Sequence, residues 1–209
     1  VVFWIDPNDN TQGLVSSIYN LGEDEEISSS GPPWGCPSLI GTSTLIGTGQ
    51  QNTDAIINIV QAVQPNCGSG DPAYAVGDST APWLCYYSNE GGYSDWYLPS
   101  INELWEMYYN RNSINQVATN YGGDQFIAPM TCDCAYWSSS EANHAITGTN
   151  GDPYWHAEII YFGNGAAAHS TKFNPNYVRA IRSFSFTPNT DTTNSVMVST
   201  SGWNYVTVT

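Results

Sequence analysis

Aromatic, amide and imidazole side chains gather in the segment 141–156, the part of the sequence best suited to ligand binding. Flat aromatic rings stack on sugars or protein surfaces, while amides donate and accept hydrogen bonds. The segment joins two expected strands and is therefore predicted to be a loop. We expect its ligand-binding residues to be Asn143, His144, Asn150, Asp152, Tyr154, Trp155 and His156. The alternative interpretation is an ordinary surface loop.

Catalytic constellations are not recognisable in the sequence. His144, His156 and His169 lack metal-ligand spacing, and neither a Gly-x-Ser-x-Gly elbow nor a Cys/His nucleophile pair stands out. An enzyme would need convergent acids, bases or a metal in a cleft. The sequence therefore favours a non-catalytic protein without a cofactor.

Two acidic segments are the places where calcium could bind. Residues 6–10 open like a calcium loop, but no glycine occupies loop position six, and Ser17 replaces the closing Glu. This pattern predicts a polar hairpin turn instead. Residues 23–26 are four consecutive acids, which is more typical of a solvated charge run.

Five cysteines allow two disulfides and one remaining thiol: Cys36, Cys67, Cys85, Cys132 and Cys134. In an exported protein such bridges are expected. We predict that at least one disulfide joins two of Cys36, Cys67 and Cys85. The closely spaced pair Cys132 and Cys134 resembles a metal half-site, but a disulfide partner beside a free thiol is the favoured interpretation.

The composition excludes several classes of partner. Only 11% of the 209 residues are charged, whereas 41% are hydrophobic and 13% aromatic, as in a packed globular protein. Nineteen acids against four bases give a net charge of −15, which repels nucleic acid and anionic lipid. No run approaches the roughly 20 apolar residues of a membrane span, so membrane insertion is not expected.

Hydrophobic periodicity indicates the helices that position these side chains. Residues 52–63 and 101–110 carry apolar residues at three- and four-residue steps, which predicts two amphipathic helices. The sequence indicates clearly where the second helix begins. Pro99 stops the preceding extended segment, and Ser100 and Glu103 have the spacing of a capping box.

Strand patterns surround these helices. A hairpin is expected over residues 1–19, an irregular connection over 66–92, and short strands at 135–139, 155–162, 166–172 and 178–184. Strands that follow helices without βαβ alternation predict an α+β fold with a small, mainly antiparallel sheet.

Three sequence blocks share an order and spacing with a known family: residues 92–104, 136–141 and 177–182. They resemble the bacterial surface-domain family found in Fibrobacter paralogous surface proteins and at the C-terminus of the Legionella collagen-like adhesin. The likeness covers residues 1–184 and implies a C-type-lectin-like fold in an exported binding or adhesive domain. We expect residues 185–209 to be a strand-rich extension or the start of another domain.

Several residues of these blocks are expected to be structural. Trp137 should belong to the core, as Ser100 and Glu103 should cap a helix. Arg179 and Arg182 have odd spacing on an expected strand and should face opposite sides. One of them is predicted to pair with a buried acid such as Glu103 or Glu141.

The leading hypothesis is a bacterial or phage domain at a cell or virion surface that binds a glycan or a surface protein. The alternative is a structural subunit of an appendage, filament or virion that binds copies of itself through its terminal strands. The tail 185–209 motivates this alternative, because alternating apolar residues need a partner sheet and a lone two-strand ribbon is marginal in water. We expect that partner to be another domain or copy.

Overall fold

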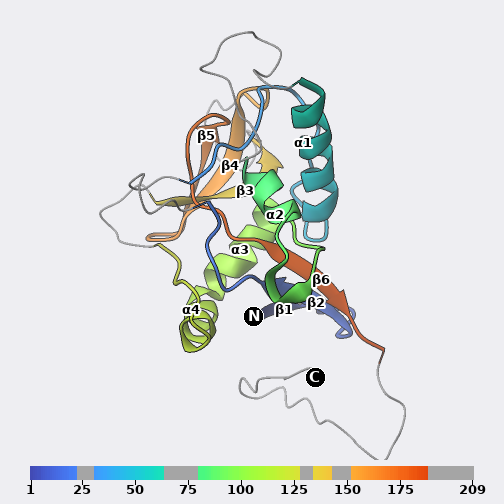
Figure 1. Ribbon diagram of the computed structural model, residues 1–209, viewed down its shortest axis with the longest axis vertical. Helices are drawn as coiled ribbons and strands as arrows, with labels where there is room; N and C mark the ends of the chain where they lie inside the picture. The colour runs from blue at the N-terminus through green and yellow to red at the C-terminus, as the bar shows by residue number, and fades with distance from the viewer. Residues whose placement is uncertain (23–30, 64–79, 128–133, 143–151, 188–209) are drawn as a thin grey trace, which may run out of the picture.

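The computed structural model describes residues 1–22, 31–63, 80–127, 134–142 and 152–187. Two three-stranded antiparallel sheets organise this part of the chain (Figure 1). In one sheet, β2 (Gln12–Ser16) lies between β1 (Val2–Ile5) and β6 (Ile181–Ser185). The expected N-terminal hairpin is thus present, and a strand from the far end of the described chain completes its sheet.

The second sheet carries the segment expected to bind ligand. Its central strand β4 (His156–Tyr161) lies between β3 (Ala135–Glu141) and β5 (Ala166–Thr171). Every residue of β3 is buried. Polar residues in a strand covered on both faces must find hydrogen-bond partners inside the protein.

Four α-helices and one short 3-10 helix occur in the described residues. They are α1 (Gly49–Val63), α2 (Ala81–Tyr86), η2 (Glu90–Gly92), α3 (Ile101–Tyr109) and α4 (Arg111–Asn120). α1 packs against α2 and β3, whereas α3 contacts β1, β3, β4 and α4. α3 therefore links the two sheets, and α1 covers one flank of the second sheet (Figure 1).

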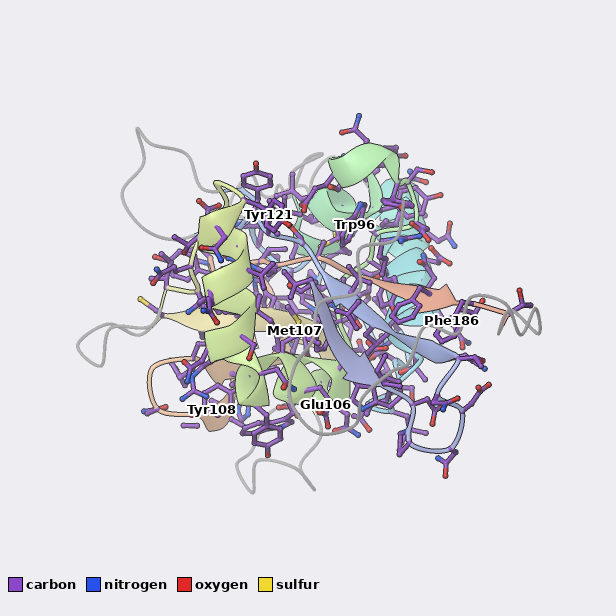
Figure 2. All side chains as sticks on the ribbon, turned by 90° about the horizontal axis from the view of Figure 1, so that it is seen from below. Trp96, Glu106, Met107, Tyr108, Tyr121 and Phe186 are labelled. Atoms are coloured by element: carbon purple, nitrogen blue, oxygen red, sulfur yellow. The ribbon has the colours of Figure 1, made fainter. Side chains whose placement is uncertain are left out.

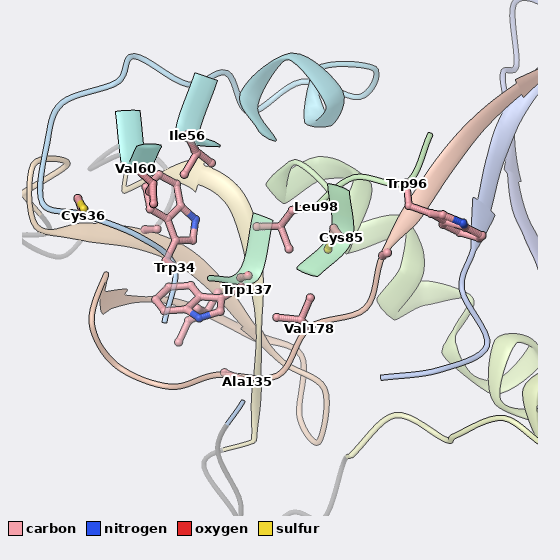
Figure 3. Packing of buried hydrophobic residues seen from close by; sticks show 14 residues of the cluster. Trp34, Cys36, Ile56, Val60, Cys85, Trp96, Leu98, Ala135, Trp137 and Val178 are labelled. Atoms are coloured by element: carbon pink, nitrogen blue, oxygen red, sulfur yellow. The ribbon is translucent and has the colours of Figure 1, made fainter. Parts of the chain in front are cut away.

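Two hydrophobic clusters use opposite faces of the second sheet. Trp137 and Ile159 face the cluster that includes Trp34 and the apolar face of α1. Figure 3 shows Ile56 and Val60 of α1 packed beside Trp34 in this cluster. The alternate residues of β3 and β4 face the cluster under α3 and α4. Figure 2 labels Met107, one of the fully buried residues of α3 in that second cluster.

The α+β fold class is confirmed, but its details differ from the expectation. Two small sheets replace the single expected sheet, and the described helices include α2 and α4 besides the two predicted ones. The segment 66–92, expected to be irregular, contains α2 and η2 in its described part. The lectin-like assignment stays a prediction. The tail beyond residue 187 lies outside the described residues.

Candidate functional site

The Trp-Ser-Ser-Ser-Glu block in β3 joins distant segments through hydrogen bonds. The Trp137 indole donates to the Pro32 carbonyl at 3.0 Å. The hydroxyl of Ser138 donates to the Glu158 carbonyl at 2.9 Å, and that of Ser140 donates to the Ser43 carbonyl at the same distance. The expectation that Trp137 belongs to the core is met.

The capping box of α3 is present. The Ser100 Oγ accepts from the Glu103 backbone N–H at 3.3 Å, while the Glu103 carboxylate accepts from the Ser100 N–H at 2.7 Å. The other carboxylate oxygen accepts from Gly47 N–H at 2.8 Å, which fixes the preceding loop onto the helix. Burial raises the pKa of Glu103, although these N–H groups oppose the shift.

Glu141 forms a buried ion pair with Lys172, with 2.7 Å between the Oε1 and Nζ atoms. Its carboxylate also accepts backbone N–H groups of residues 40–42. The Lys172 Nζ lies 4.5 Å from the centre of the Trp34 ring. Burial lowers the pKa of Lys172, while Glu141 acts in the opposite direction. Glu141, Lys172, Trp34 and the backbone of residues 40–42 therefore form a structural centre of the domain.

The prediction that Arg179 or Arg182 pairs with Glu103 or Glu141 is wrong. Buried Arg179 lies before β6 and donates to the Asn20 side chain and to backbone carbonyls, whereas Arg182 forms a two-bond pair with Asp95. Both acids bind other donors instead of these arginines. Glu103 accepts backbone N–H groups, and Glu141 pairs with Lys172.

The cysteine prediction needs one correction. Cys85 is a free, buried thiol and does not take part in a disulfide. Neither Cys36 nor Cys134 is free. Cys67 and Cys132 lie outside the described residues, so the pairing of the other cysteines stays a prediction.

Within the expected ligand loop, residues 152–156 are described, whereas Asn143, His144 and Asn150 lie outside the described residues. Asp152 organises this end of the loop. Its carboxylate accepts from the Tyr154 N–H, and its carbonyl accepts from the N–H groups of Trp155 and His156 at 3.0 and 2.9 Å. The turn holds two aromatic rings outward, with Tyr154 44% and Trp155 39% exposed.

These aromatic residues continue into a wider surface formed with β5. The Tyr154 and Trp155 ring centres are 5.2 Å apart, and Trp155 lies 6.3 Å from Phe173. The His156 and His169 rings are also 5.2 Å apart. Residues 152–156 therefore share a surface with residues that follow them in the chain. This cluster offers stacking faces and hydrogen-bonding groups, the chemistry of a binding surface.

Sequence reasoning missed His169, Phe173 and the polar residues 174–176 next to this surface. The signal for His169 was available in part. An antiparallel hairpin around the glycine-containing turn 163–165 brings the two expected strands together, and the observed register pairs Glu158 with His169. Nothing in the sequence pattern indicated the approach of residues 174–176.

The acidic side chains of the N-terminal turn, residues 6–12, form hydrogen bonds within the turn, as expected for a hairpin turn. The Asp6 carboxylate accepts from the Asn8 N–H, and the Asp9 carboxylate accepts from Thr11 and Gln12. Among the described residues, no three His, Cys, Asp or Glu side chains converge as a metal site. Residues 23–26 lie outside the described residues.

The match to a known family covers the Glu141–Lys172 ion pair and the candidate surface. The model of the Lcl C-terminal domain matches residues 50–182, which is more than half of the chain. The chain belongs to this family. The matched segment contains α1 except its first residue, the capping box of α3 and the whole second sheet of this Lcl C-terminal domain. A search of curated proteins found no match. None of the described helices has the length and apolar character needed to cross a bilayer.

Proposed function

We propose that this Lcl C-terminal domain is a non-catalytic binding domain of an exported, surface-associated, adhesin-like protein. Its ligand is a glycan or a surface protein, bound at the aromatic surface around residues 152–156. The observation that carries the proposal is the pair of outward rings on a turn fixed by Asp152. Large rings held in one conformation bind with little loss of conformational entropy.

The chemistry of the described surface also supports binding rather than catalysis. Tyr154 and Trp155 supply stacking area, while His156 and the nearby polar residues supply hydrogen bonds. Such a combination suits sugars and the polar surfaces of proteins. Membership in the Lcl C-terminal domain family supports this adhesin-like assignment.

A glycan array combined with a panel of immobilised surface proteins tests the proposal, each with and without a calcium chelator. Trp155→Ala should reduce binding at least tenfold, because the variant removes the largest exposed ring of the surface. Tyr121→Ala is the matched control, since Tyr121 is 74% exposed at the end of α4 (Figure 2). Equal binding by the Trp155→Ala variant and the unaltered chain would exclude this surface as the ligand site.

Assembly through terminal strands is the second candidate function. The sheet formed by β1, β2 and β6 exposes Val2 and Ile5, and Phe186 protrudes beyond β6 (Figure 2). Phe186 lies where the chain leads into the alternating tail. Removal of residues 187–209 would then leave a folded monomer that no longer associates, as measured by light scattering. A full chain that is monomeric at all concentrations would contradict this candidate.

A further inference from the structure

A hollow of about 540 Å³ lies beside the aromatic surface. It is lined by Ile159 and Tyr161 of β4, by β5, and by residues 174–176. The residues of β5 that line it are His169, Ser170 and Thr171. His156 also lines the hollow and directly follows Trp155, so the hollow and the aromatic surface are continuous.

The lining is polar, but the described residues that form it include no carboxylate, ammonium or guanidinium group. Its polar side chains are those of His156, Tyr161, His169, Ser170, Thr171, Asn174 and Asn176. Hydroxyls and amides both donate and accept hydrogen bonds. This set matches a ligand with many hydroxyl groups and no formal charge.

Asn176 is the most informative of these residues. It is only 8% exposed, and its side-chain nitrogen has no hydrogen-bond partner. Buried amide donors in native proteins are nearly always paired, so this unpaired donor, on a residue that lines the hollow, is one that a bound hydroxyl would pair with when the Asn176 side chain turns toward the hollow. Nearby, the Asn174 amide donates to the Ser170 hydroxyl at 3.1 Å, which leaves the hydroxyl hydrogen of Ser170 available for donation.

We propose that this hollow binds one unit of an uncharged saccharide, with its hydroxyls on Asn174 and Asn176, and an adjoining unit stacked on Trp155. The inference rests on the proposed function and narrows its ligand to neutral glycans. The net charge of −15 supports the choice, because it repels sulfated or carboxylated polymers at long range.

Calorimetric titration of the whole 209-residue chain tests the inference. The probes are neutral hexasaccharides of glucose, mannose and N-acetylglucosamine, with a heparin-derived hexasaccharide as the charged comparison. At least one neutral probe should bind, and the heparin fragment should not. Ser170→Trp, which fills the hollow, and Asn176→Ala should each weaken neutral binding at least tenfold. Tyr121→Ala should leave binding unchanged.

Thermal unfolding identifies any variant that fails to fold, and Asn174→Ala then replaces it, since this residue is exposed. The inference is overturned if no neutral probe binds, if only the heparin fragment binds, or if folded hollow variants bind normally. If glycan or protein binding depends on Trp155 but not on the residues of the hollow, this inference is wrong and the proposed function still holds. If the unaltered chain binds no glycan and no surface protein, the proposed function is wrong as well.

Discussion

Two ion pairs of nearly equal length occupy opposite environments in this domain. Lys172 and Glu141 are 2.7 Å apart in the interior, while Arg182 and Asp95 are 2.6 Å apart at the surface. The first pair is covered by Trp34 and by backbone N–H donors. The second has a half-exposed carboxylate. Distance alone therefore does not indicate how much each pair contributes to stability.

The difference lies in what remains when one partner is removed. Water solvates a surface charge that has lost its partner, so exposed pairs contribute roughly 0–1 kcal/mol. Water does not reach a buried charge, and removal of one partner typically costs about 3–5 kcal/mol. The four predictions below test this contrast, beginning with the largest expected effect.

Glu141→Ala should lower the free energy of unfolding by about 3–5 kcal/mol, because Lys172 would be left in the interior without its acid. Urea denaturation measures the change. As a control, the double variant Glu141→Leu with Lys172→Met should recover much of the stability, since it removes both charges. A loss below about 1 kcal/mol in the single variant would contradict the contrast between the two pairs.

Glu103→Gln should cost about 1–3 kcal/mol, since glutamine has one carbonyl oxygen where two carboxylate oxygens accept N–H groups. Burial raises the pKa of Glu103 above its ordinary value of 4.5. At a pH between these two pKa values, the folded state binds more protons than the unfolded state. This acid's contribution to stability therefore falls as pH rises through that range. Denaturation curves across pH 4–7 should show the dependence in the unaltered chain and its loss in the variant.

Ser100→Ala should lower the free energy of unfolding by about 1 kcal/mol through loss of the N-cap bond of α3. Thermal or urea unfolding measures this effect. Ser185→Ala, at an exposed position in β6, is the matched control and should have almost no effect. An unchanged midpoint for Ser100→Ala would show that the Ser100 side chain does not stabilise α3 as a cap.

Asp95→Asn should have the smallest effect, less than about 1 kcal/mol at neutral pH and weaker in high salt. The hydrogen bond from Arg182 lowers the pKa of Asp95 below its ordinary value of 3.8. The ion pair therefore makes its full contribution to stability above pH 3.8, and this contribution is lost as pH falls through the lowered pKa. The stability difference between variant and unaltered chain should disappear in acid, and a difference that persists there would exclude the ion pair as its cause.

Local patterns predicted the features that depend on neighbouring residues. Ser100 and Glu103 form their capping box because both partners lie within one helical turn. The second helix and the strands of the β3–β5 sheet were also predicted close to their observed bounds, since hydrophobic period and turn residues act over short distances. α2 was missed because it has only six residues and lies inside a segment rich in glycine and proline.

Partner choice between distant segments could not be predicted in the same way. Glu141 could have paired with any of four bases in the chain, and only the folded structure brings it to Lys172. The candidate surface shows the same limit. The loop pattern identified Trp155 and His156, whereas Asn176 joins them through the path of the chain after β5. Sequence patterns therefore indicated one side of this candidate surface but not the other.

The buried free thiol of Cys85 makes this residue a chemical reporter of domain opening. Burial raises its pKa far above the ordinary thiol range, so the reactive thiolate is suppressed in the folded state. An alkylating reagent can modify Cys85 only when α2 separates from α1 and the core around Trp34 opens. The modification rate of the Cys85 peptide, followed by mass spectrometry, thus measures how often that part of the domain opens without any denaturant.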